Sequence, residues 1–224
     1  MAGRVVALFI GLAILSCRNI QKKESINTQI KMSELLDSTY LFNGKTLEGW
    51  EITNFGPQGP VYITGNEIIL GMGDGCTGIT WKKEFPTINF KVTLDAKKVV
   101  GNDFFCGMTF PVGKYPCTLI VGGWGGTTVG LSSINGADAS ENETTSLQKF
   151  EKDVWYNICL IVKTDTIKAL IDDKVVVNFA IGNRKLSIRP EVELSKPFGI
   201  TSWNTTAALR NIRVEQIEDE IRLR

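Results

Sequence analysis

Residues 155–163 read WYNICLIVK, and every second side chain in this segment is apolar: Tyr156, Ile158, Leu160 and Val162. The positions between them hold Asn157, Cys159, Ile161 and Lys163. Alternation with a period of two places the two sets on opposite faces of a strand. The segment therefore predicts a half-buried β-strand, and residues 90–99 repeat the pattern over a longer run.

From Tyr40 onward the chain consists of short segments rich in β-branched and aromatic residues, separated by Gly, Asn, Asp and Pro. The expected strands span residues 61–63, 67–70, 78–82, 90–99, 103–110, 117–122, 155–163, 166–172, 174–181, 198–203 and 207–217. The sequence shows no apolar stripe of helical period longer than about two turns. Many short strands with almost no helix predict an all-β sandwich or barrel.

Turn-forming residues predict how several of these strands connect. Residues 64–66, TGN, have the chemistry of a tight hairpin, and residues 172–173, DD, read as a second one. Residues 111–116, PVGKYP, are expected to form a wider turn.

Regular alternation is also expected in the last strand. Leu209, Asn211 and Arg213 should occupy one face, opposite Arg210, Ile212 and Val214. Three tryptophans are expected in the core: Trp50, Trp81 and Trp155.

The first residues have the features of a targeting segment. Arg4 precedes an apolar run, residues 5–15, that is too short to span a bilayer. The run ends in Ser16 and Cys17, which resembles the bacterial lipoprotein cleavage motif, where the cysteine becomes the lipidated first residue. An ordinary secretory signal with an unrelated cysteine is the alternative. Because Arg18 is not the aspartate that retains such proteins in an inner membrane, we expect an outer-membrane anchor in the cell envelope.

This interpretation divides the chain into three parts. Residues 1–17 are the signal peptide, the polar residues 18–37 form a flexible tether, and residues 38–224 form a single β-sandwich domain of ordinary size.

Composition excludes some classes of function. The 25 basic and 24 acidic residues nearly cancel, and no basic run is interleaved with aromatics, so a nucleic-acid partner is not expected. With no histidine and no C-x-x-C pair, no metal site is expected, although Ca²⁺ held by oxygen ligands stays open. No other cofactor is indicated. Four cysteines are either disulfide-bonded, in any of three pairings, or small core residues: Cys76, Cys106, Cys117 and Cys159.

A glycine-rich stretch, residues 122–145 (GGWGGTTVGLSSINGADASENETT), combines one tryptophan with a polar loop. Glycines on both sides of Trp124 leave the ring open, and its flat apolar face suits a sugar ring. We interpret the stretch as the lip of a carbohydrate-binding face. The alternative is a core tryptophan whose glycines permit close sheet packing.

Catalysis on glycosides would need a pair of carboxylates. Because the chain has no histidine, the acid–base groups would have to be carboxylates, or a lysine or tyrosine with a lowered pKa. The best catalytic candidates are Glu143 and Asp138, which share one loop with Glu141. The alternative is a solvated loop whose polar groups satisfy turns.

Four further side chains join Trp124 as candidates for substrate binding. Asn142 adjoins Glu143, and Trp203 ends an expected strand. Arg184 and Arg189 could bind sugar hydroxyls or a loop carboxylate through their planar guanidinium groups. Structural ion pairs are the alternative for the arginines.

Residues 41–50, LFNGKTLEGW, resemble the opening of the bacterial 3-keto-disaccharide hydrolase domain family. The resemblance continues through residues 122–126, 142–145, 171–173 and 209–214. It implies a concanavalin- or laminin G-like jelly-roll β-sandwich of two antiparallel sheets. It also implies action on oxidised disaccharides or related glycosides, by hydrolysis or elimination.

Two hypotheses of different class follow, and whether the protein is an enzyme stays open between them. The first is an envelope-anchored glycoside hydrolase or lyase, with a pocket that brings Glu143 within about 10 Å of another carboxylate or a lysine. The second is a non-catalytic carbohydrate-binding or adhesion module, with a shallow aromatic-lined groove. Both expect a carbohydrate ligand and membrane attachment through Cys17. A structural lipoprotein that binds nothing is a third alternative.

Overall fold

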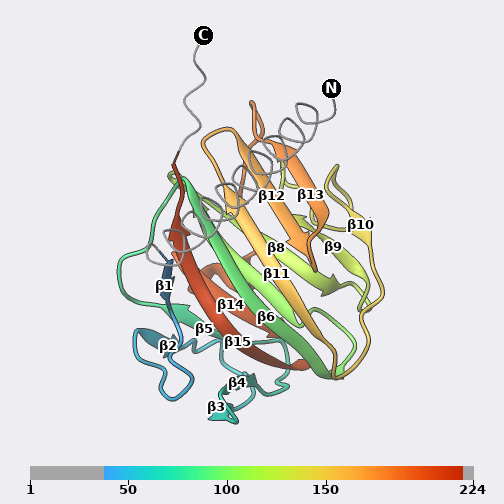
Figure 1. Ribbon diagram of the computed structural model, residues 1–224. Helices are drawn as coiled ribbons and strands as arrows, with labels where there is room; N and C mark the ends of the chain where they lie inside the picture. Colours follow the sequence, from blue (N-terminus) through green and yellow to red (C-terminus); the bar gives the residue numbers. More distant parts are fainter. Residues whose placement is uncertain (1–37, 219–224) are drawn as a thin grey trace, which may run out of the picture. The chain divides into compact units, whose positions relative to one another are not determined.

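The computed structural model describes residues 38–218, so Cys17 and the segments expected to be a signal peptide and a tether lie outside the described residues. The described chain forms two antiparallel sheets and one short 3-10 helix, η1 (Pro190–Ser195). In Figure 1 the sheet that contains β6, β11 and β15 lies in front of the sheet that contains β5, β8 and β14. The expected all-β sandwich of two antiparallel sheets is confirmed.

The first sheet has eight strands. In spatial order they are β13 (Lys174–Ala180), β12 (Thr166–Ile171), β11 (Trp155–Val162), β6 (Phe90–Gly101), β15 (Thr205–Gln216), β4 (Glu67–Leu70) and β3 (Val61–Thr64), with β1 (Ser38–Tyr40) beside β15. The second sheet has seven. They are β10 (Ser146–Leu147), β9 (Thr128–Ser132), β8 (Tyr115–Gly123), β7 (Cys106–Val112), β14 (Phe198–Trp203), β5 (Cys76–Trp81) and β2 (Trp50–Ile52).

The core lies between the sheets and follows the predicted alternation. On β6, buried residues alternate with half-buried ones over most of the strand. Strands β7 and β9 are instead buried at every position, because loops cover the outer face of their sheet. A Cβ at Gly130 would lie 3.0 Å from the carbonyl oxygen of Ala139, and one at Gly199 would lie 2.7 Å from that of Ser195. Two covering segments, residues 133–145 and 183–197, thus lie against this outer face.

The opening motif at residues 41–50 is explained by folding. The Asn43 side chain accepts hydrogen bonds from the backbone N–H groups of Lys45, at 2.8 Å, and Thr46, at 2.9 Å, which closes a turn. The Trp50 indole N–H donates to the carbonyl oxygen of Leu41 at 2.7 Å, and its ring packs 5.1 Å from that of Trp81. The motif therefore fixes the entry of the chain into the sandwich.

The expectation of a wider turn at residues 111–116 is wrong. Strands β7 and β8 continue to Val112 and Tyr115, which pair directly across a two-residue loop. Hydrogen-bonded and non-hydrogen-bonded pairs alternate in an antiparallel ladder. Pro111 and Pro116 face each other next to the pair that closes the loop, so they form a pair that needs no backbone N–H. The two prolines are therefore compatible with the strands.

The expected alternation of the last strand is wrong beyond Arg210. The pairing of β15 with β6 shifts between Arg210 and Arg213, and Asn211 has φ of 55°. This β-bulge turns Ile212 to the side of Leu209, and both are fully buried.

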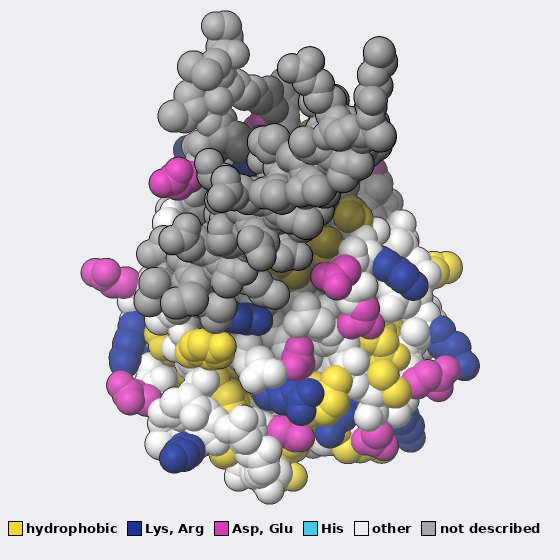
Figure 2. Space-filling model, in the orientation of Figure 1, with side chains coloured by type: hydrophobic (Ala, Val, Ile, Leu, Met, Phe, Trp, Pro, Cys, Tyr) yellow, Lys and Arg dark blue, Asp and Glu magenta, His cyan; other side chains and the backbone are white. Residues whose placement is uncertain are grey.

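Trp50 and Trp81 are in the core, with 7% of each residue exposed, but the expectation for Trp155 is wrong. Trp155 lies on the outer face of the eight-stranded sheet, where the guanidinium of Arg210 is 4.0 Å and the ammonium of Lys97 4.4 Å from its ring centroid. Figure 2, seen from the side of this sheet, shows basic and acidic side chains interspersed over the described surface.

The four cysteines at positions 76, 106, 117 and 159 are free thiols, and all but Cys159 are buried. Burial raises the pKa of Cys106 and of Cys117 to about 12. These thiols therefore act as small core residues. Within residues 38–218, no helix has the length and apolar character needed to cross a membrane.

Candidate functional site

A cavity of about 220 Å³ opens on the outer face of the seven-stranded sheet. Its floor is formed by Thr118 and Ile120 of β8 together with Ser132 at the end of β9. Strand alternation places these side chains there, because Cys117, Leu119 and Val121 point to the opposite side, into the core.

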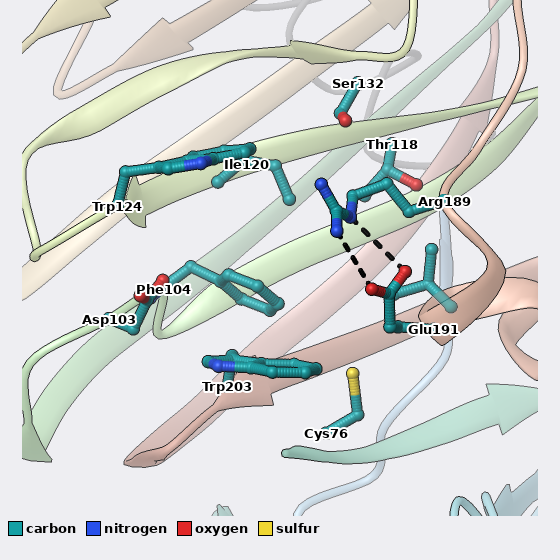
Figure 3. A pocket seen from close by; sticks show the side chains of 11 residues that line it. Cys76, Asp103, Phe104, Thr118, Ile120, Trp124, Ser132, Arg189, Glu191 and Trp203 are labelled. Atoms are coloured by element: carbon teal, nitrogen blue, oxygen red, sulfur yellow. Dashed lines mark hydrogen bonds and ion pairs between the residues drawn. The ribbon is translucent and has the colours of Figure 1, made fainter. Parts of the chain in front are cut away.

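One side of the cavity is aromatic and the other is charged. Figure 3 shows the rings of Trp124 and Trp203 nearly edge-on, with Phe104 between them. Arg189 and Glu191 face these rings across the cavity. A flat apolar surface opposite a hydrogen-bonding pair suits a ligand with one apolar face and several polar groups.

Trp124 projects into the cavity from a turn built by glycines. The backbone N–H of Gly126 bonds to the carbonyl oxygen of Gly123 at 3.2 Å, and Trp124 between them has φ of 46°. A large L-residue in this left-handed region costs roughly 1–2 kcal/mol. The tryptophan, which is 41% exposed, is thus held in a conformation that glycine would adopt at lower cost.

Trp203 is positioned by the end of β14. Its backbone N–H donates to the carbonyl oxygen of Phe104 at 3.0 Å, and the two ring centroids lie 6.4 Å apart. The next residue, Asn204, has φ of 43° and accepts a hydrogen bond from the N–H of Gly75 at 2.8 Å. A Cβ at Gly75 would lie 3.7 Å from the Trp203 ring, so the backbone at Gly75 passes beside this ring.

The charged side is a clamp that consists of Arg189, Glu191 and Asp138. Arg189 donates to Glu191 through Nη2 at 2.9 Å and Nε at 3.3 Å, and its Nη1 pairs with the carboxylate of Asp138. Asp138 also accepts from the hydroxyls of Ser132, at 3.1 Å, and Ser133, at 2.9 Å. The clamp therefore joins the two covering segments beside the cavity.

Arg189 and Glu191 stabilise each other's charged forms. The hydrogen bond from Arg189 lowers the pKa of Glu191, and the bond with Glu191 raises the pKa of Arg189. Glu191 is consequently an ionised acceptor at neutral pH and is poorly suited to donate a proton.

A third carboxylate, Asp103, lies on the aromatic side next to Phe104 (Figure 3). Its Oδ1 accepts from the backbone N–H of Phe104 at 2.8 Å, and its own N–H donates to the hydroxyl of Thr205 at 3.0 Å. Within residues 38–218, no basic side chain pairs with this carboxylate. Asp103 is therefore available to a ligand.

The sequence candidates separate into two groups. Trp124, Trp203 and Arg189 line the cavity, and Asp138 bonds to Arg189 from the neighbouring loop.

The other group lies outside the cavity lining. The carboxylate of Glu143 pairs with Arg184, at 3.1 Å to Nε and 3.0 Å to Nη2, and both side chains are substantially exposed. Asn142 donates to the carbonyl oxygens of Leu131, at 2.7 Å, and Asp138, at 2.8 Å, so its amide holds the loop.

Sequence reasoning missed several residues of the cavity: Cys76, Asp103, Phe104, Thr118, Ile120, Ser132, Glu191 and Val192. A local signal existed for Thr118 and Ile120, which alternate with apolar core residues. Glu191 has none, because its position depends on how η1 lies against the sheet. No cluster of three or more potential metal ligands occurs within residues 38–218.

The solved structures that resemble this fold include the following three. A protein from Parabacteroides distasonis ATCC 8503 that is classed as a glycosyl hydrolase is 15% identical, with 82% of this chain and 95% of that chain covered and a TM-score of 0.53. The carbohydrate-binding module CBM66 from Bacillus subtilis is 19% identical, with 75% and 95% covered and a TM-score of 0.50. A Bacillus subtilis protein of unknown function with a galectin-like fold is 13% identical, with 80% and 94% covered and a TM-score of 0.57.

At these identities the likeness shows the fold, and the expected jelly-roll sandwich is confirmed. A comparison with curated proteins gives no match. The family described as the 3-keto-α-glucoside-1,2-lyase-like domain matches residues 37–215. This match supports a carbohydrate-active protein. Because the matched region includes nearly all of the sandwich, the chain belongs to the family of 3-keto-α-glucoside-1,2-lyase-like domains.

Proposed function

We propose that the protein binds a carbohydrate in this cavity, with one sugar ring between the aromatic side and the clamp. The observation that carries the proposal is the arrangement of Trp124, Phe104 and Trp203 opposite the Arg189–Glu191 pair. The volume, about 220 Å³, is below the roughly 300–1,000 Å³ of sites for drug-sized ligands, which suits a single monosaccharide unit.

Each part of the cavity has a role in this proposal. The tryptophan rings cover the C–H face of the sugar and remove it from water. Glu191 accepts hydrogen bonds from sugar hydroxyls, while Thr118 and Ser132 can donate or accept at the floor. Since an ionised Glu191 is a poor general acid, these contacts favour binding over two-carboxylate hydrolysis.

The proposal is tested by NMR titration of the 38–224 domain with methyl glucosides, 3-keto-glucosides and short oligosaccharides. Removing one ring should cost about 1–2 kcal/mol of binding free energy, so Trp124→Ala and Trp203→Ala should each weaken binding about tenfold. Trp155→Ala, which removes a tryptophan from the opposite sheet, is the matched control and should bind like the parent. Equal affinity in all three variants would place the ligand elsewhere.

A second candidate function is elimination, which the family and the carboxylate of Asp103 favour. In a 3-keto-glycoside the ketone acidifies the proton on C2, so a single carboxylate can act as the base. Asp103 would take this proton, the C2–H electron pair would form the C1=C2 double bond, and the C1–O bond would break. The leaving oxygen then takes up a proton from solvent.

This second candidate predicts that the protein converts a 3-keto-glucoside to an enone, which is followed by ultraviolet absorbance. Asp103→Asn should lower the rate at least 100-fold with little loss of affinity. Glu143→Gln, outside the cavity lining, should keep the parent rate. Binding without turnover by the parent protein would leave carbohydrate recognition as the function.

We also propose that Cys17 carries the lipid anchor and that the protein is attached to the outer membrane. Support comes from the apolar run that ends at Ser16-Cys17 and from Arg18 after it. A fatty-acid label supplied to the producing bacterium should enter the parent protein and should not enter Cys17→Ala. Labelling of that variant, or recovery of the parent with the inner membrane, would contradict the proposal.

A further inference from the structure

The cavity contains more negative than positive charge. Among the residues that line it, Asp103 and Glu191 are acidic and Arg189 is basic, and Asp138 adds a third carboxylate through its bond to Arg189. Three carboxylates against one guanidinium leave a formal charge of −2. Lys98 approaches the Trp124 turn, where its Nζ lies 3.8 Å from a Cβ built at Gly126, but it is not part of the lining.

Among the described residues 38–218, Arg189 is the only basic side chain of the lining, and it is already bonded to carboxylates of the protein. Arg189 directs its Nε and Nη2 to Glu191, which occupies the edge that could bind a carboxylate with two parallel bonds. Its Nη1 pairs with Asp138, so the other edge is partly occupied too. A carboxylate on a ligand would therefore meet like charge without gaining a guanidinium partner.

Hydroxyl and ammonium groups of a ligand would instead find hydrogen-bond acceptors in the cavity. Each oxygen of Glu191 has acceptor capacity beyond its bond to Arg189, and Asp103, which is part of the lining, has no basic partner within residues 38–218. Neutral hydroxyls can donate to both groups. A protonated amine would in addition be attracted by the negative charge.

We propose that the cavity selects sugars by charge, so that it takes neutral sugars and amino sugars and rejects uronic acids. This inference rests on the proposed carbohydrate function of the same cavity. The discrimination comes from the carboxylates that bond to Arg189. They occupy the guanidinium, which would otherwise bind an acidic sugar, and they present acceptor oxygens to the ligand.

The test uses methyl α-glucoside and two charged analogues, each of which differs from it at a single carbon: methyl α-glucuronide at C6 and methyl α-glucosaminide at C2. The three probes are titrated into the purified protein and followed by NMR at pH 7. The glucuronide should bind about tenfold or more weaker than the glucoside, and the glucosaminide at least as tightly. In 1 M NaCl the difference between glucoside and glucuronide should narrow, because salt screens charges at a partly open site.

Glu191→Gln tests the clamp. It removes one negative charge and frees an edge of Arg189, so the ratio of glucoside to glucuronide affinity should fall at least fivefold. Asp138→Asn removes the other carboxylate of the clamp, which lies in the loop at residues 133–145, and should also lower the ratio of glucoside to glucuronide affinity. With two variants the test still works if one of them does not fold. The matched control is Glu193→Gln on η1, whose carboxylate pairs with Lys196, and its ratio should stay at the parent value.

Each outcome has one meaning. Glucuronide binding as tight as glucoside binding in the parent protein would overturn the charge selection and leave the carbohydrate function standing. A strong preference for glucoside that neither Glu191→Gln nor Asp138→Asn changes would overturn the role of the clamp. Failure of all three probes and of the wider oligosaccharide panel to bind would overturn the carbohydrate function itself, and the inference with it.

Discussion

Trp124 shows at the scale of one residue how the site depends on local strain. Its φ of 46° is a conformation in which glycine has no Cβ penalty, and glycines stand on both sides of it. Trp124→Gly removes the ring and also relieves the backbone strain. Trp124→Ala removes the ring but keeps the strain, because alanine still has a Cβ. We therefore expect the Trp124→Gly protein to be more stable than the Trp124→Ala protein. Its free energy of unfolding, measured with urea, should be higher by about 1 kcal/mol.

Leu147 on β10 supplies the control, because it is 76% exposed and is not among the residues with positive φ. At this position the order should reverse, with Leu147→Gly less stable than Leu147→Ala. The same order at both positions would contradict the assignment of strain to Trp124. Both Trp124 variants should bind sugar equally poorly, since both lack the ring.

At the scale of an element, the loop at residues 133–145 depends on Asn142. The Asn142 amide donates to three backbone carbonyls, and its oxygen accepts from the N–H of Thr144 at 2.9 Å and its hydroxyl at 2.6 Å. Asn142→Ala leaves several of these groups without a partner, so it should lower the free energy of unfolding by about 2 kcal/mol.

The loss should also be local. Backbone amides of residues 133–145 should exchange hydrogen faster in Asn142→Ala, and sugar affinity should fall because Asp138, which holds Arg189, sits in the same loop. Asn183→Ala, at an exposed position between β13 and η1, should leave stability and exchange unchanged. A stable variant with unaltered exchange would show that the loop is held by other contacts.

The strands were predictable from the sequence because period-two alternation and turn chemistry are local signals. The hairpin at residues 64–66 and the turn at Asp172 and Asp173, with φ of 48° and 64°, form where Gly, Asn and Asp occur. The bulge at Asn211 was not predictable, because it is defined by the register against β6. Strand β9, within the glycine-rich stretch, was not predictable for a similar reason. Its Gly130 is needed because the covering loop passes close to it, and that contact is tertiary.

The site was only partly predictable. Trp124 has a local signal in its glycines, whereas the clamp joins Asp138 to Arg189 across 51 positions of sequence. Glu143 has polar neighbours on both sides and Asp138 lies between two alanines, yet it is Glu143 that pairs with Arg184 outside the cavity lining. Which carboxylate of the loop bonds to Arg189 is decided by tertiary packing, and the residues around Asp138 in the sequence do not predict it.

At the scale of the domain, the two sheets differ in what covers their outer faces. Loops cover much of the seven-stranded sheet and leave the cavity between them. The eight-stranded sheet has a polar outer face, where Asp95 of β6 accepts hydrogen bonds from Asn157 at 2.9 Å, Asn211 at 2.8 Å and Arg210 at 3.2 Å. One carboxylate thus joins the three central strands β11, β6 and β15.

This network predicts how the stability of the domain changes with pH. Burial, the largest single influence, raises the pKa of Asp95, but the bonds from Asn157, Asn211 and Arg210 together outweigh it and leave the pKa lowered. As pH falls, the unfolded chain therefore binds its proton before the folded state does. The contribution of Asp95 is fully present above the ordinary carboxyl pKa of about 4 and is lost as pH falls through the lowered folded value.

The change that isolates this contribution is Asp95→Asn, compared with the parent by urea unfolding between pH 7 and pH 2.5. At pH 7 the variant should lose about 1–3 kcal/mol, because three donors then face an amide in place of a carboxylate. The difference should stay constant down to about pH 5 and shrink below it, since the parent loses the same charge by protonation. Glu141→Gln, on the exposed cavity-side loop, should follow the parent throughout. A difference between Asp95→Asn and the parent that stays constant to pH 2.5 would mean that shape, and not the charge of Asp95, joins the central strands.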